Sequence, residues 1–176
     1  LQDYGMRVFD AIVTPAQGGS LRMFICNDQR TQTSRLRVLE TKERDTRLNT
    51  EETCLKYKEN VLTVTNNLRT KLEGIKEQGK TIAGYGAAAK GNTLLNYLEA
   101  DTSMIGYIAD NNPLKQGKVT PGSHIPIISD QEFLHKNPSH ALLFAWNYLD
   151  YFLKNSEYIK KGGKFIVPLP SPKIIP

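Results

Sequence analysis

The chain has 176 residues, which is enough for one well-buried core but not for two full domains. Hydrophobic residues make up 39% and charged residues 23%, the usual balance of a soluble globular protein, and no apolar run is long enough to span a membrane. The net charge of +5 suits an anionic ligand, whereas the scattered basic residues, without interleaved aromatics, argue against a nucleic-acid-binding protein.

The first predicted elements are two strands joined by a turn. Residues 6–13 (MRVFDAIV) alternate roughly between apolar and polar side chains, and LRMFICND follows the turn TPAQGGS. This arrangement predicts a β-hairpin within residues 1–28. Residues 29–47 are polar and have no clear period, which predicts a linker.

A long amphipathic helix is predicted over residues 48–79. Its sequence contains no proline and one internal glycine, and leucines recur at helical spacing between Lys and Glu. Thr50 provides an N-terminal cap ahead of two glutamates, and Gly79 ends the helix. The pattern fits one helix or a helix pair. Both a packing role and a role as a partner helix remain open.

Residues 80–176 alternate between short apolar strands and helical segments. We expect strands at 80–84, 104–109, 140–145 and 165–169, helices at 87–98, 130–136 and 150–161, and a polar loop at 111–125. This alternation predicts an α/β fold, a Rossmann-like open and mostly parallel sheet with flanking helices.

The segment GYGAAAKGN follows the first of these strands and opens the next helix. It contains the pattern G-x-G-x-x-A, in which Gly84 would permit the tight turn around Tyr85 and Gly86 would let the backbone approach a phosphate. Ala89 would allow the helix to pack closely on the sheet. The N–H groups at the helix N-terminus would then face an anion.

Lys90 lies in the first turn of this helix, where a cation opposes the helix dipole. That position is favourable if the ammonium meets a bound anion such as a pyrophosphate. Asn92 and Thr93 are close enough in sequence to add further donors. The lysine therefore indicates a phosphate-bearing ligand at this turn.

The ends of the later strands supply more candidate residues. Asp110, Asn111 and Asn112 follow the second strand at the edge where ligands of open α/β sheets bind, and an acidic residue there often meets a ribose hydroxyl. Lys115 is a flexible cation near the same edge. After the third strand, Trp146 is placed to stack on a base or sugar beside Asn147, although a core or lid position stays open.

In four segments the chain resembles the C-terminal domain of sugar C-methyltransferases that use S-adenosylmethionine: GYGAAAKGNTLLNYL, YIADNNPLKQGKVTPGSHIPI, AWNY and GGKFIVPLP. A fifth segment, VFDAIVTPAQGGSLRMF, resembles the junction between the methyltransferase domain and the C-terminal domain of that family. The resemblance runs over nearly the whole chain and keeps the order of the segments.

The resemblance implies that the Rossmann-like domain binds a nucleotide-sugar linked to UDP or dTDP. Zinc and S-adenosylmethionine would be held by upstream domains of the same protein, so we expect neither in this chain and no methyl transfer by this chain alone. The upstream methyltransferase domain would be its partner, and the two isolated cysteines suit a cytoplasmic protein. No catalytic residue is assigned. The implied substrate-binding residues are Gly84, Tyr85, Gly86, Lys90, Asn92, Thr93, Asp110, Asn111, Lys115, Trp146 and Asn147.

One position departs from the family pattern. Gln17 stands before the glycine pair, where the family usually has a histidine. Glutamine can form hydrogen bonds but cannot titrate near neutral pH, so the activity or substrate of this protein could differ from that of its relatives.

Two other functions stay open. The glycine pattern and Asp110 also suit an NAD(P)-binding oxidoreductase domain, although no Tyr-x-x-x-Lys pair accompanies them. Alternatively, the long helix could be the centre of a non-catalytic interaction module. Binding of a nucleotide-sugar, of NAD, or of neither would separate these three functions.

Overall fold

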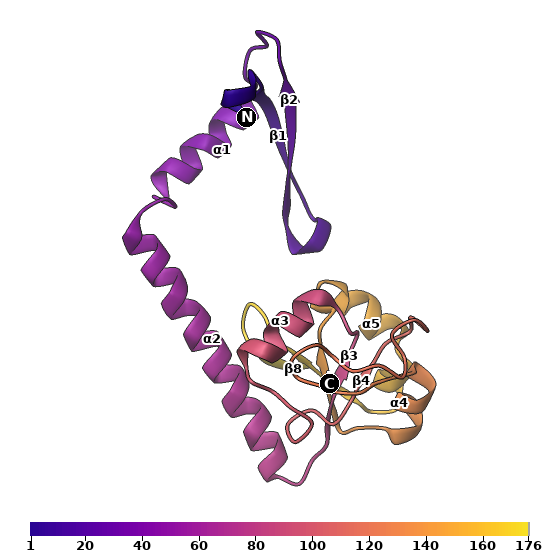
Figure 1. The fold of residues 1–176 in the computed structure, drawn as a ribbon. Helices are drawn as coiled ribbons and strands as arrows, with labels where there is room; N and C mark the ends of the chain where they lie inside the picture. The colour runs from indigo at the N-terminus through magenta and orange to yellow at the C-terminus, as the bar shows by residue number, and fades with distance from the viewer. Residues whose placement is uncertain (176) are drawn as a thin grey trace. The chain divides into compact units, whose positions relative to one another are not determined.

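A computed structural model describes residues 1–175, apart from the side chain of Gln2, so the last residue of the predicted C-terminal domain, Pro176, lies outside it. The chain forms two compact units, Leu1–Glu59 and Asn60–Pro176. Helix α2 (Glu51–Glu77) carries the boundary between them and runs without a break in Figure 1. Within the described part, no helix is long and apolar enough to cross a membrane.

The N-terminal unit is built on an antiparallel hairpin, as predicted. Strand β1 (Arg7–Thr14) pairs with β2 (Ser20–Cys26), and the short 3-10 helix η2 (Ala16–Gly18) forms the turn between them. A second 3-10 helix, η1 (Gln2–Tyr4), precedes the hairpin. Gln17 lies at the tip in the left-handed region, with φ of 56°.

The segment predicted as a linker contains a helix, α1 (Ser34–Asp45). Thr33 caps this helix, because its hydroxyl oxygen accepts the N–H of Leu36 at 3.3 Å. The same hydroxyl donates to the Asp10 carboxylate on β1 at 2.6 Å. The cap thus depends on a residue 23 positions away, and the helix buries only Leu36, so the local pattern did not indicate it.

Helix α2 begins three residues after the predicted start at 48 and ends two residues before the predicted end at 79. Thr50 accepts the N–H of Thr53 at 3.4 Å, and Gly79 follows the helix with a left-handed φ of +71°. It is one helix, the first of the two predicted forms. Three apolar residues of its second half are buried in the core of the C-terminal unit: Leu68, Leu72 and Ile75.

The C-terminal unit is a six-stranded sheet with the strand order β5-β4-β3-β6-β7-β8. Its strands are β3 (Ile82–Tyr85), β4 (Ile108–Ala109), β5 (Ile127–Ile128), β6 (His140–Leu143), β7 (Lys164–Val167) and β8 (Lys173–Ile175). All neighbours pair in parallel except β7 and β8, which confirms the predicted open and mostly parallel sheet. Strands β5 and β8 were not predicted, and β4 is shorter than expected.

Helices cover both faces of this sheet. They are α3 (Ala89–Tyr97), α4 (Asp130–Lys136), α5 (Leu149–Asn155) and α6 (Glu157–Lys160), with the 3-10 helix η3 (Trp146–Tyr148) before α5. The second half of α2 and α3 pack in one core cluster, and α4, α5 and α6 pack in another on the opposite face. The single helix predicted over 150–161 is therefore two helices, which meet at Ser156.

The strand order places a topological switch point at β3 and β6. From β3 the chain proceeds outward to β4 and β5 on one side, then returns to β6 and proceeds to β7 and β8 on the other. In open α/β sheets, ligands bind beyond the carboxyl ends of the strands at this point. The glycine-rich turn after β3 lies at this edge of the sheet.

Candidate functional site

The two glycines of the predicted turn have different roles. Gly84 lies inside β3, where an added Cβ would be 2.5 Å from the Phe144 ring and 2.7 Å from Ile108. The prediction that Gly84 makes the tight turn was therefore wrong, because close packing requires this glycine. Gly86 makes the turn instead, with φ of +82°, and its N–H donates to the carbonyl of Ala109 at 2.7 Å.

Helix α3 approaches the sheet through Gly91 and not through Ala89. An added Cβ on Gly91 would lie 2.5 Å from the ring of Phe144, whereas Ala89 is exposed. The residue before the helix, Ala88, provides no side-chain cap. The first N–H groups of α3 thus have neither an intrahelical acceptor nor a capping oxygen, and they are available to an anion.

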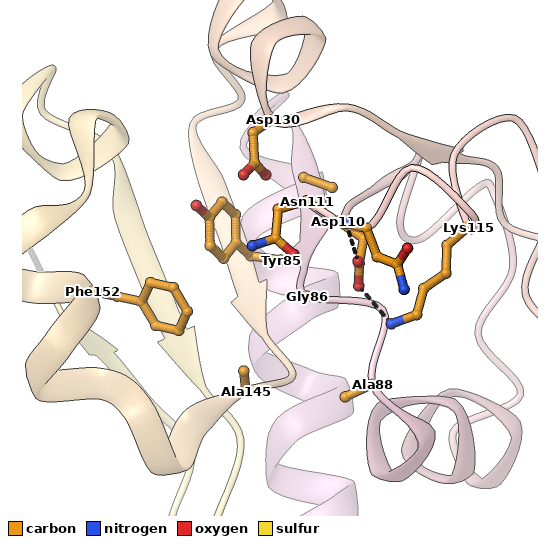
Figure 2. Close-up of a pocket in the computed structure, with 11 residues that line it drawn as sticks. Tyr85, Gly86, Ala88, Asp110, Asn111, Lys115, Asp130, Ala145 and Phe152 are labelled. Carbon is orange, nitrogen blue, oxygen red and sulfur yellow. Dashed lines mark hydrogen bonds and ion pairs between the residues drawn. The ribbon is translucent and has the colours of Figure 1, made fainter.

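A hollow of about 340 Å³ opens beside this turn at the carboxyl ends of β3 and β4 (Figure 2). Its volume falls within the range of small-molecule sites, about 300–1,000 Å³. Five of the predicted residues line it: Tyr85, Gly86, Asp110, Asn111 and Lys115. Asn112, which was placed at this edge together with Asp110 and Asn111, also lines it. Two further residues of its wall were not predicted: Asp130 and Phe152.

Asp110 and Lys115 form an ion pair that joins the loop after β4 to the turn. The Lys115 ammonium donates to Asp110 Oδ2 at 3.0 Å and to the carbonyl of Ala87 at 2.9 Å, while Asp110 Oδ1 accepts the N–H of Asn112 at 2.9 Å. Figure 2 shows the lysine reaching across to the carboxylate. Both oxygens of the buried Asp110 are therefore engaged, and a cation is fixed next to the glycine turn.

Tyr85 and Asp130 lie on the opposite side of the same hollow, where Figure 2 shows them close together. Burial, and then the charge of Asp130, raise the pKa of the Tyr85 hydroxyl to about 12, so it remains protonated. Burial, and then the charge of Asp110, raise the pKa of the Asp130 carboxyl above its usual range. A half-buried carboxyl with a raised pKa in a cleft is a candidate functional group.

A second hollow, of about 390 Å³, lies next to the α3 side of the turn and shares Ala88 and Lys115 with the first. Asn92 and Lys118 are among its polar lining residues. Within the described residues, Asn92 Oδ1 is buried without a hydrogen-bond partner, and so is Nδ2 of Asn147. Because unpaired buried polar atoms are costly, Asn92 offers an acceptor to a ligand in this hollow.

Lys90 and Trp146 meet across the switch point. The ammonium of Lys90 lies 4.5 Å from the centroid of the Trp146 ring, a cation–π contact. Thr93 is exposed, and its hydroxyl donates to the carbonyl of Ala89 at 3.4 Å on its own helix. Five of the predicted residues line neither of these two hollows: Gly84, Lys90, Thr93, Trp146 and Asn147.

Asp130 had a sequence signal that was missed. It follows the apolar pair of β5, Ile127 and Ile128, by two positions, so it lies at the carboxyl end of a parallel strand just as Asp110 does. A strand of two residues has no periodicity, which is why the segment was assigned to a loop. Recognition of β5 would have brought Asp130 into the candidate site.

Comparison with known proteins gives consistent matches. A family model described as the C-methyltransferase C-terminal domain matches residues 15–170. The C-methyltransferase NovU of Streptomyces niveus is 35% identical to the chain over 177 residues, an alignment that covers 99% of the chain and 42% of NovU. The chain thus spans about two-fifths of the length of this relative.

Proposed function

Because the chain belongs to the C-methyltransferase C-terminal domain family, we propose that it binds the nucleotide-linked sugar on which a C-methyltransferase acts. One observation carries this proposal: the ammonium of Lys115 is fixed beside a glycine turn that opens an uncapped helix. Both features attract an anion to the same place. A pyrophosphate at the turn would satisfy the free N–H groups of α3.

The two hollows suit the two ends of such a ligand. They lie next to the turn and share Ala88 and Lys115, so a pyrophosphate at the turn would leave a nucleoside in one hollow and a sugar in the other. The unpaired buried Oδ1 of Asn92, which lines the second hollow, would gain a partner from the ligand. Lys90, which lies in the first turn of α3, is a second cation near the glycine turn, in addition to Lys115.

The methyl donor belongs to another part of the protein in this proposal. More than half of NovU lies outside the match. We propose that domains upstream of this one hold S-adenosylmethionine and zinc, so that the chain would hold the substrate without methylating it. Its two free cysteines suit a reducing cytoplasm.

The hairpin offers a surface for the upstream domain. Four large apolar side chains along it are exposed: Val13, Leu21, Met23 and Ile25. The three on β2 alternate and therefore share one face, and Val13 pairs with Leu21 in the register. An exposed apolar row of this kind is typical of a contact surface between domains or proteins.

Asp110 bears on the alternative of NAD(P) binding. In dinucleotide sites the acidic residue after the second strand accepts hydrogen bonds from ribose hydroxyls. Asp110 occupies that place, and its carboxylate oxygens accept from Lys115 and from the N–H of Asn112. Because each carboxylate oxygen can accept a second hydrogen bond, this residue suits both ligands, and titration separates them.

Calorimetric titration of the chain with UDP-sugars, dTDP-sugars, NAD and S-adenosylmethionine tests the proposal. We expect saturable binding of at least one nucleotide-sugar and no comparable heat from NAD or S-adenosylmethionine. Saturable binding of NAD without a response to any nucleotide-sugar would contradict the proposal. A blank with all four ligand classes would favour an interaction module built around α2.

A further inference from the structure

Asp130 is a charged group of the first hollow that the described fold does not engage. It lies in the first turn of α4, but the cap of that helix is Ser129, whose side chain accepts the N–H of Glu132 at 3.1 Å. The nearby cation, Lys115, already donates to Asp110 and Ala87. Asp130 therefore serves neither the cap nor an ion pair.

The surroundings of Asp130 make its charge costly. The side chain is half-buried, and both its burial and the neighbouring charge of Asp110 disfavour the ionised form. Asp130 lies in the first turn of the short helix α4, where the dipole favours an acidic residue, whereas burial and the charge of Asp110 raise its pKa. A cost of this kind without structural benefit is characteristic of a functional residue.

The neighbours of Asp130 define what it can bind. The carboxylate of Asp130 repels a phosphate, whereas that of Asp110 is paired with Lys115, so the charged part of a ligand is directed toward the α3 N-terminus. A neutral hydroxyl or N–H can instead donate to Asp130. Tyr85 and Phe152 line the same hollow and supply aromatic surface against which a ring can pack.

We propose that Asp130 accepts a hydrogen bond from a neutral, hydroxyl-bearing ring of the nucleotide-sugar. This contact fixes the direction of the ligand, with the ring at Asp130 and the pyrophosphate at the turn between Gly86 and Lys90. The ring is either the sugar or the nucleoside, since both carry hydroxyl groups. This inference rests on the proposed function and adds a specificity-determining residue to that site.

The test compares Asp130→Ala and Asp130→Asn with the wild type in calorimetric titrations of inorganic pyrophosphate, dTDP, dTDP-glucose, UDP and UDP-glucose. We expect Asp130→Ala to weaken nucleotide-sugar binding about tenfold or more, because a hydrogen bond to a charged acceptor is lost. Asp130→Asn should lose less affinity, because the amide oxygen of the asparagine can still accept a hydrogen bond from the ligand. Pyrophosphate affinity should stay the same or increase, because a repelling charge is removed.

Glu132→Gln is the matched control. Glu132 lies on the same helix, carries the same charge, is exposed and pairs with Lys136 at 3.5 Å outside the first hollow. It should leave every affinity unchanged. Thermal melts check that a loss of affinity does not come from a loss of stability. Both Asp130 variants should unfold at the wild-type temperature or above it, because they remove an unfavourable charge. A lower unfolding temperature would make Asp130 a structural residue and overturn the proposal.

The comparison among the titrated ligands shows whether Asp130 contacts the sugar ring or the nucleoside. If Asp130→Ala lowers the affinity for dTDP and UDP as well as for their sugars, Asp130 contacts the nucleoside. If it lowers the affinity for the nucleotide-sugars alone, Asp130 contacts the sugar. Unchanged nucleotide-sugar affinity in Asp130→Ala, or an equal loss for pyrophosphate, overturns the contact while the proposed function stands. Failure of the wild type to bind any nucleotide-sugar removes the proposed function and this contact with it.

Discussion

Lys90 and Lys115 are close to the same turn but have different partners. Lys115 donates to the Ala87 carbonyl and pairs with the buried Asp110, so it serves the fold as well as the candidate site. Lys90 contacts the face of the Trp146 ring, and its position in the first turn of α3 opposes the helix dipole. A bound anion would make the position of Lys90 favourable.

These differences predict different outcomes for two alanine variants. Lys90→Ala should weaken nucleotide-sugar binding by about 1–3 kcal/mol, the range for a charge-assisted hydrogen bond, and leave the unfolding temperature nearly unchanged. Lys115→Ala should also lower the unfolding temperature, because the buried Asp110 loses its counter-charge. Calorimetry and thermal melts measure both effects.

Lys154→Ala is the control for these variants, because Lys154 is an exposed lysine of α5 that lines neither hollow. It tests whether overall charge alone changes affinity. An unchanged dissociation constant in Lys90→Ala would remove Lys90 from the site. Equal losses in Lys90→Ala and Lys154→Ala would indicate a general electrostatic effect instead of a direct contact.

The sequence predicted residues of this site better than it predicted their roles. Tyr85, Asp110 and Lys115 could be assigned to one edge because the ends of parallel strands meet there. The predicted role of Gly84 was wrong, because the need for a glycine there comes from close packing against Phe144, which is 60 positions away in the sequence. No local pattern shows that a ring will lie against that glycine.

At the scale of elements, one carboxylate joins helix α1 to the hairpin. The Asp10 side chain accepts from the Thr33 hydroxyl at 2.6 Å and from Arg35 Nε at 2.8 Å, and it also pairs with a terminal nitrogen of Arg35. The hydrogen bonds from Arg35 and then from Thr33 hold the pKa of Asp10 far below its usual range. Ionised Asp10 therefore stabilises the N-terminal unit.

This lowered pKa predicts acid sensitivity of the hairpin. The stabilisation is fully present above the unfolded pKa of about 4 and is lost as the pH falls below it toward the folded pKa. We expect hydrogen exchange at the β1 and β2 amides to accelerate, relative to unfolded-peptide rates, as the pH falls from 5 to about 2. Arg35→Gln should accelerate it already at neutral pH.

Arg22→Gln is the matched control on the hairpin, because Arg22 is exposed on β2 and makes none of the ion pairs of the described residues. Its exchange profile should follow that of the wild type. Protection in Arg35→Gln equal to the wild type at neutral pH would show that Asp10 does not hold α1 to the hairpin.

Element length decided which elements could be predicted. Helix α2 spans 27 residues with an apolar period, so its type and approximate ends were evident in the sequence. Strands β4 and β5 have two residues each, too few for any periodicity. Helix α1 buries one residue and depends on Asp10 for its cap network, so its sequence was indistinguishable from a polar linker.

At the scale of the whole molecule, alternating strands and helices were sufficient to predict the open α/β sheet. They did not specify the strand order, because the return from β5 to β6 is set by tertiary pairing of β6 with β3. That order creates the switch point and makes its edge the candidate site. The chain belongs to the C-methyltransferase C-terminal domain family and spans about two-fifths of the length of NovU, and the substrate-binding role of this edge is our proposal.

Amide chemical-shift mapping during titration with a dTDP- or UDP-sugar tests the central claim most directly, because it reports where on the chain the ligand binds. We predict that saturable shifts cluster at the Gly86–Asn92 turn and helix start, in the loop from Asp110 to Lys115, and around Asp130 and Asn147. Saturable shifts confined to the hairpin or the first half of α2, or no shifts at millimolar nucleotide-sugar, would contradict the claim that the switch point holds the substrate.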